Sequence, residues 1–199
     1  MPSPVEIIEG EPFVLNVSAS ARPSRIDYKW EKESERNLDS SPNTDVWFNG
    51  GILHIPKVSK SHAGSYVIRA NNSEGATMTE VRLDVLFPPK ISNISEPVMV
   101  DSGEDAMFEC TFTANPIMYD GIQWLRHNIQ IEETEAIVTD SSRRFSIDWD
   151  DIGGNMVRTR LVIRNATVQD AGKIFCAISN GYEEQARSQT YLLVKRKYY

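Results

Sequence analysis

The side chains of this 199-residue chain that could catalyse a reaction or bind a metal form no recognised motif. The three histidines, His54, His62 and His127, stand apart, and none has neighbouring residues at metal-ligand spacing. No glycine-rich phosphate loop and no nucleophile elbow occurs in the sequence. We therefore expect a protein that is not an enzyme and that uses no cofactor, metal or small-molecule substrate.

Two acidic clusters offer carboxylate oxygens, which are the ligands that calcium prefers. The first contains Glu132, Glu133 and Glu135, and the second contains Asp148, Asp150 and Asp151. Neither cluster matches a known pattern of loop ligands, so both are interpreted as solvated edges.

Asparagine glycosylation is a further chemistry that the sequence allows. Four Asn-x-Ser/Thr sequences, none with proline in the middle, begin at Asn16, Asn71, Asn93 and Asn165. We expect at least one of the four to carry a glycan. A face that carries a glycan is a poor docking face.

The formal charge is −7, which disfavours a nucleic-acid partner because such proteins are usually basic. The one basic cluster, KRK at 195–197, is interpreted as the start of a linker. No apolar stretch is long enough to span a membrane, and no signal peptide follows Met1. The chain is therefore interpreted as a piece of a larger protein.

The main feature of the sequence is an internal repeat. Each half contains Gly-Glu, an alternating strand ending near a proline, a tryptophan strand, Leu-x-Ile, Ala-Gly and a final hairpin. These signals span 10–75 in the first half and 103–181 in the second. Alternation of apolar and polar residues predicts antiparallel strands with one buried face. Many short strands separated by turns predict an all-β sandwich or barrel.

The two copies meet at DVLFPPKISNIS (84–95), where strand alternation stops at Phe87. Pro88-Pro89 cannot donate ladder hydrogen bonds and favours a short, stiff connection. We predict two domains, 1–88 and 89–199, joined end to end by this Pro-Pro linker.

The second copy resembles the immunoglobulin superfamily through Cys110, Trp124 and Cys176, with Asp170-Ala171-Gly172 before the second cysteine. The first copy has Trp30 in the tryptophan strand and Tyr66 at the tyrosine-corner position. The resemblance implies two tandem immunoglobulin-like β-sandwiches, the second of variable or intermediate type. It also implies a disulfide between Cys110 and Cys176, which indicates an oxidising, extracellular compartment.

The first copy has Val17 and Ile68 where the family carries its two cysteines, so this domain lacks the disulfide between the sheets. Both side chains should pack on Trp30, each burial contributing about 1.5–3 kcal/mol, against about 4 kcal/mol for a bridge. Two explanations of this loss are open. The sequence drifted while the domain stayed stable enough, or a more easily deformed domain was useful in an extended receptor. In the second copy Ile174 replaces the corner tyrosine.

Two packing interactions are expected in the second copy. Arg143 or Arg144 should pair with Asp170, a solvated arginine being the alternative. Trp149 shares a strand face with Phe145 and is interpreted as a core residue.

The phrase CTFTANPIMYDGIQW (110–124) is similar to nephrin-like proteins, a group that includes insect myoblast-fusion receptors and is linked to echinoid-type adhesion molecules. This resemblance implies a glycosylated, single-pass cell-surface receptor for adhesion or recognition. Its partners would be other cell-surface ectodomains, and these two repeats would either bind them or act as spacers. The sequence does not identify the partner-binding residues.

Two alternatives remain at this stage. The first is a membrane-proximal pair of repeats from a growth-factor receptor kinase, with contacts at the corner KVSKSH (57–62). The second is an intracellular muscle-filament pair, against which the paired cysteines and the glycosylation sequences argue.

Overall fold

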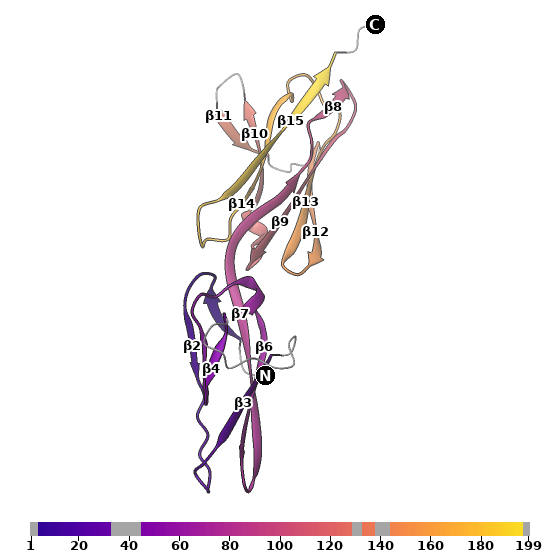
Figure 1. The fold of residues 1–199 in the computed structure, drawn as a ribbon. Helices are drawn as coiled ribbons and strands as arrows, with labels where there is room; N and C mark the ends of the chain where they lie inside the picture. Colours follow the sequence, from indigo (N-terminus) through magenta and orange to yellow (C-terminus); the bar gives the residue numbers. More distant parts are fainter. Residues whose placement is uncertain (1–3, 33–44, 129–132, 138–143, 197–199) are drawn as a thin grey trace. The chain divides into compact units, whose positions relative to one another are not determined.

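The computed structural model describes residues 4–32, 45–128, 133–137 and 144–196. Nearly all its regular structure is β-strand, with two short 3-10 helices (Figure 1). The predicted all-β class is therefore confirmed. The chain divides into two compact units, Met1–Phe87 and Pro88–Tyr199, which we call the first and second domains.

The first domain contains two sheets. Its strands are β1 (Val5–Ile8), β2 (Phe13–Asn16), β3 (Asp27–Lys32), β4 (Trp47–Asn49), β5 (Ile52–Ile55), β6 (Gly64–Asn72) and the beginning of β7 (Gly75–Ile94). One sheet has the order β1-β7-β6-β3, with β1 parallel to β7, and the other has the order β2-β5-β4. Burial alternates along β2 and β5, as expected for sheets with one face on a core.

The core of the first domain is built around Trp30, whose side chain is fully buried. Trp30 lies opposite Ile68 in the β3–β6 ladder, and its indole Nε1 donates to the carbonyl oxygen of Gly50 at 3.1 Å. Val17 is half-buried against the same core, and its N–H donates to the Gly51 carbonyl at 2.9 Å. Val17 and Ile68 therefore both contribute apolar surface to the core that contains Trp30.

Tyr66 ties β6 to the turn that precedes it. The 3-10 helix η1 (Lys60–His62) ends two residues before β6, and the Tyr66 hydroxyl donates to the His62 carbonyl at 2.9 Å. Both side chains are buried. This buried bond holds the turn before β6 in place, because breaking it would remove a hydrogen-bond donor from the His62 carbonyl.

The second domain also contains two sheets. Its elements are the end of β7, β8 (Val98–Asp101), β9 (Ala106–Asn115), η2 (Tyr119–Gly121), β10 (Ile122–Asn128), β11 (Glu133–Ala136), β12 (Phe145–Gly153), β13 (Met156–Ile163), β14 (Gly172–Ile178) and β15 (Ala186–Lys195). One sheet has the order β12-β13-β9-β7, and the other has the order β11-β10-β14-β15-β8. Their facing sides share one apolar core, centred on Phe108, Trp124 and Leu161. Ile174 is buried in this core at the position where the first domain has Tyr66.

The linker predicted at the junction is not confirmed. β7 does not end at Phe87 but runs through Pro88 and Pro89 to Ile94, so the predicted Pro-Pro linker is not seen as a separate segment. The fixed φ of proline lies within the extended region, so two prolines remove ladder donors without ending an extended conformation. The division into compact units falls within this strand.

Tyr66→Phe tests the corner of the first domain. We expect a loss of about 1–2 kcal/mol in the free energy of unfolding, because the His62 carbonyl loses a buried donor. Chemical denaturation measures this loss. Tyr191→Phe, at an exposed tyrosine of the second domain, is the control and should change stability by less than about 0.5 kcal/mol. Equal effects of the two variants would contradict the role of the corner.

Candidate protein-interaction face

A disulfide joins the two sheets of the second domain. Cys110 of β9 and Cys176 of β14 are both fully buried, with their Cα atoms 6.4 Å apart, and close a loop with a sequence separation of 66. Trp124 lies opposite Cys176 in the ladder, as Trp30 lies opposite Ile68 in the first domain. The two domains therefore have the same arrangement around the tryptophan, with a disulfide in only one of them.

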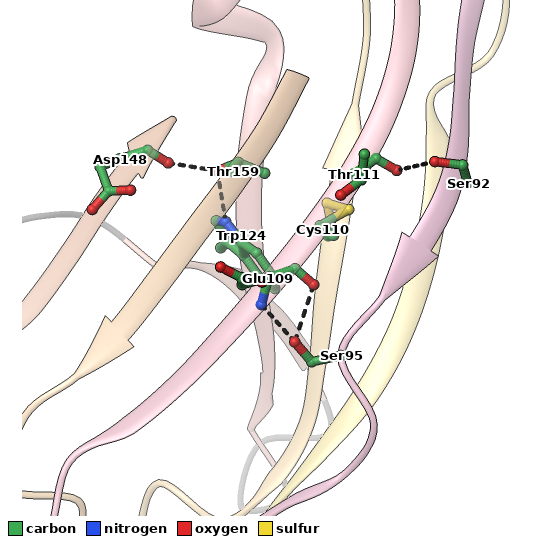
Figure 2. The surroundings of a disulfide bond; sticks show 9 residues. Ser92, Ser95, Glu109, Cys110, Thr111, Trp124, Asp148 and Thr159 are labelled. Atoms are coloured by element: carbon green, nitrogen blue, oxygen red, sulfur yellow. Dashed lines mark hydrogen bonds between the residues drawn. A yellow bond between two sulfur atoms is a disulfide. The ribbon is translucent and has the colours of Figure 1, made fainter. Parts of the chain in front are cut away.

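The buried Trp124 has a polar partner on the opposite sheet. Its Nε1 donates to Thr159 Oγ1 at 3.1 Å, and this hydroxyl donates to the Asp148 carbonyl at 3.1 Å (Figure 2). Figure 2 shows these two hydrogen bonds beside the disulfide. The indole N–H and the threonine hydroxyl are thus both satisfied inside the core, where an unpaired polar group would be costly.

Asp170, which lies just before β14, accepts several hydrogen bonds. Its side chain is only 2% exposed and forms an ion pair with Arg144. The N–H and hydroxyl of Thr167 also donate to its Oδ2, at 2.7 and 2.8 Å. Arg144 is one of the two expected partners, and Arg143 lies outside the described residues. Gly172 begins β14 two residues later.

The second acidic cluster binds an arginine. Arg160 contacts Asp148 at 3.3 Å and Glu109 at 3.0 Å, and it also pairs with Asp150. Within the described ranges, no three histidine, cysteine or acidic side chains are grouped to hold a metal ion. In the first cluster Glu135 pairs with Arg126 at 3.4 Å. Glu132 lies outside the described residues.

Trp149 is not a core residue. It is 47% exposed, and its ring stacks on Tyr119 with centroids 5.4 Å apart. The strand alternation that suggested burial is present, but β12 is the outermost strand of its sheet and its second half is exposed. The alternation of residues shows which face of a strand points toward the core. It does not show where along the strand the opposite sheet stops covering that face.

The four asparagines predicted to accept glycans are all exposed. Asn16 ends β2, Asn71 lies in β6, Asn93 lies near the end of β7, and Asn165 lies in the turn after β13. None of the five strands in the sheet β11-β10-β14-β15-β8 contains one of these asparagines. Any glycan on the second domain is therefore attached outside this sheet.

The outer side of this five-stranded sheet carries apolar side chains from strands far apart in the sequence. We call Leu125, Phe175, Tyr191, Leu193 and Met99 the apolar face. Tyr191 is 38% exposed, Leu193 is 46% exposed and Met99 is 55% exposed.

The strand register arranges the apolar face around two cross-strand pairs, with Gln189 opposite Phe175 and Lys173 opposite Tyr191 between them. Leu125 pairs with Phe175 between β10 and β14, and Leu193 pairs with Met99 between β15 and β8. The Arg187 guanidinium lies 3.8 Å from the centroid of the Phe175 ring, which adds a cation to the face. Aromatic residues, methionine and arginine are the types enriched in protein interfaces.

Sequence reasoning missed this face, although part of its signal was present. In β14 the residues Ile174 and Cys176 point inward, so Phe175 between them must point outward. An outward phenylalanine in a central strand is the signal. Its apolar neighbours are Leu125 of β10, directly opposite, and Tyr191 of β15, on the diagonal, and the sequence does not give the register of these strands.

Family models match both domains. An immunoglobulin domain model matches residues 1–72, and an immunoglobulin I-set domain model matches residues 89–193. The chain belongs to the immunoglobulin superfamily. The predicted pair of tandem immunoglobulin-like domains is therefore confirmed, and the I-set match agrees with the expected type of the second domain.

The relatives agree with the resemblance to nephrin-like proteins. Rat (Rattus norvegicus) nephrin is 29% identical over 191 residues, which covers 96% of this chain and 14% of nephrin. The neuronal cell adhesion molecule of Gallus gallus is 26% identical over 152 residues, covering 76% of this chain and 10% of that protein. This chain thus spans a small part of the length of the relatives it matches.

A solved structure shows the same two-domain fold. The crystal structure of Dpr2 Ig1-Ig2 in complex with DIP-Theta Ig1-Ig3 contains a chain that is 25% identical, with a TM-score of 0.74. The match covers 97% of this immunoglobulin pair and 62% of that chain. In the described part of the immunoglobulin pair, no helix is long and apolar enough to span a membrane.

Asp170→Asn tests the buried ion pair. We expect a loss of about 2–3 kcal/mol in the stability of the second domain, because asparagine keeps an acceptor for Thr167 but loses the charge that Arg144 needs. Chemical denaturation measures the loss. Glu109→Gln is the control, because the Glu109 side chain is 36% exposed whereas that of Asp170 is buried, and should cost less than about 1 kcal/mol. A smaller loss for Asp170→Asn than for the control would refute this account.

Proposed function

We propose that this chain is part of the extracellular region of a cell-surface adhesion or recognition receptor. The buried disulfide supports an oxidising compartment, since such bridges are rare in the cytosol. The similarity to a protein named as a cell adhesion molecule supports the adhesion class. The parent protein would be glycosylated and anchored by a single membrane span.

The second domain would bind another immunoglobulin-domain ectodomain through the apolar face. The observation that carries this proposal is a group of outward apolar side chains, three of them exposed, on a sheet whose strands contain none of the four sequon asparagines. Exposed apolar patches on soluble domains usually mark binding sites. The similarity to a structure of immunoglobulin domains in complex with one another supports a partner of the same class.

Electrostatics gives the apolar face a means of selecting its partner. Arg187 stands over Phe175, and Lys173 lies opposite Tyr191 in the ladder, so the face has two cations among its apolar groups. A partner with carboxylates at matching positions would be favoured, and one with cations there would be repelled. Exposed charges around an apolar centre are the usual arrangement of a protein interface.

Leu193→Lys tests this function. The secreted, glycosylated chain is measured by sedimentation velocity for self-association and by surface binding against a set of immunoglobulin-domain ectodomains. We expect binding to at least one ectodomain, its own copy included, and a loss of tenfold or more in affinity for the variant. The loss follows because a lysine within the apolar face would place a charge where the interface buries an apolar side chain.

Met107→Lys is the matched control. Met107 is 55% exposed but lies on β9, in the opposite sheet, so its substitution should leave the affinity unchanged. Binding to no ectodomain would contradict the proposed function and favour a spacer. Equal losses in the two variants would show that the contact lies elsewhere.

A further inference from the structure

The outer face of the sheet β2-β5-β4 in the first domain carries a stacked pair of aromatic rings. Trp47 of β4 and His54 of β5 lie opposite each other, with ring centroids 3.9 Å apart and planes 6° apart. Val14 of β2 lies opposite His54 on the other side and is 58% exposed. These three side chains form one row across the sheet.

The acceptor Asn16 lies on the same face, in the next row. Phe13 and Leu15 pack on the core, so Val14 and Asn16 point away from it. Asn16 lies opposite Ile52 of β5, which is two residues from His54 and therefore shares its face. Asn16 and His54 are therefore diagonal neighbours, and such side chains lie within about 7–8 Å of each other.

We propose that Asn16 carries an N-linked glycan whose first N-acetylglucosamine packs on the aromatic platform, defined as Val14, Ile52, His54 and Trp47. The glycan would then stabilise the first domain. This proposal rests on the proposed function, because glycan transfer takes place in the secretory pathway.

The chemistry of the sugar fits the platform. One side of an N-acetylglucosamine ring is a row of C–H groups, and the N-acetyl group adds a methyl, so both can cover aromatic and aliphatic surface. The bond to Asn16 holds the sugar beside the platform at a high effective concentration, so a weak contact is enough. Covering Val14 and Trp47 would remove exposed apolar surface from water.

The sequon at Asn71 is a built-in comparison. Asn71 lies opposite Asp27 of β3 and opposite Ala76 of β7. Its diagonal neighbours in these ladders are Lys29 and Met78, so a glycan at Asn71 has no aromatic ring opposite it or on the diagonal, whereas Asn16 has His54 on the diagonal. A glycan at Asn16 should therefore stabilise the first domain, and a glycan at Asn71 should not.

The test compares the melting temperature of the first domain in two secreted variants that each lose one sequon. Ser18→Ala removes the sequon of Asn16 and should lower the melting temperature by about 3–6 °C. Ser73→Ala removes the sequon of Asn71 and should leave it unchanged. An endoglycosidase that leaves a single N-acetylglucosamine should not lower the melting temperature of the unsubstituted chain, because the first sugar makes the contact.

The platform is tested by combining Ser18→Ala with Trp47→Ser. In the Trp47→Ser background, loss of the sequon should lower the melting temperature by less than about 1 °C. Nuclear Overhauser contacts between the first sugar and the Trp47 indole provide a second readout in the unsubstituted chain, which does not depend on how the variant folds.

Each contrary result has a separate meaning. Equal effects of Ser18→Ala with and without Trp47, or absence of the sugar–indole contacts, would overturn the proposal. Mass spectrometry that finds Asn16 bare while another sequon is occupied would also overturn it and leave the extracellular function intact. A secreted chain with no sequon occupied would count against both this proposal and the extracellular function. Self-association of the Ser18→Ala protein that Trp47→Ser abolishes would identify a second copy as the occupant instead.

Discussion

The packing of one tryptophan between two sheets is the constraint on which the rest of each domain depends. Trp30 and Trp124 are fully buried, and each indole N–H has a buried or half-buried acceptor, the Gly50 carbonyl or the Thr159 hydroxyl. A large ring with a satisfied polar group fixes both the spacing and the register of the strands around it. The disulfide of the second domain is added to this arrangement, and the first domain has the same arrangement without it.

This constraint separates the residues that hold the fold from those free to interact. Because the core occupies the inward positions of the central strands, only outward positions are left for the contacts we propose. In the second domain these are the apolar face, and in the first domain they are the aromatic platform beside Asn16. The two surfaces have different chemistry, since the apolar face combines apolar groups with cations and the aromatic platform lies next to a predicted glycan acceptor.

The sequence predicted what depends on local pattern and on spacing. Alternation placed the strands, the two repeats placed Trp30 and Trp124, and the family resemblance paired Cys110 with Cys176. What it missed depends on long-range register and on the extent of coverage. The apolar face combines β8, β10, β14 and β15, and the stack of Trp47 on His54 depends on the pairing of β4 with β5. Trp149 was misjudged because alternation does not show where the opposite sheet ends.

Exchange of the two indole N–H protons with solvent, measured by NMR with and without a reductant, tests most directly whether the tryptophan core holds the first domain. The account predicts strong protection of the Trp30 indole that reduction leaves unchanged. Protection of the Trp124 indole should fall by about a thousandfold, since a bridge of this loop length is worth about 4 kcal/mol. A Trp30 indole that is unprotected in the oxidised protein, or that loses protection together with Trp124, would contradict it.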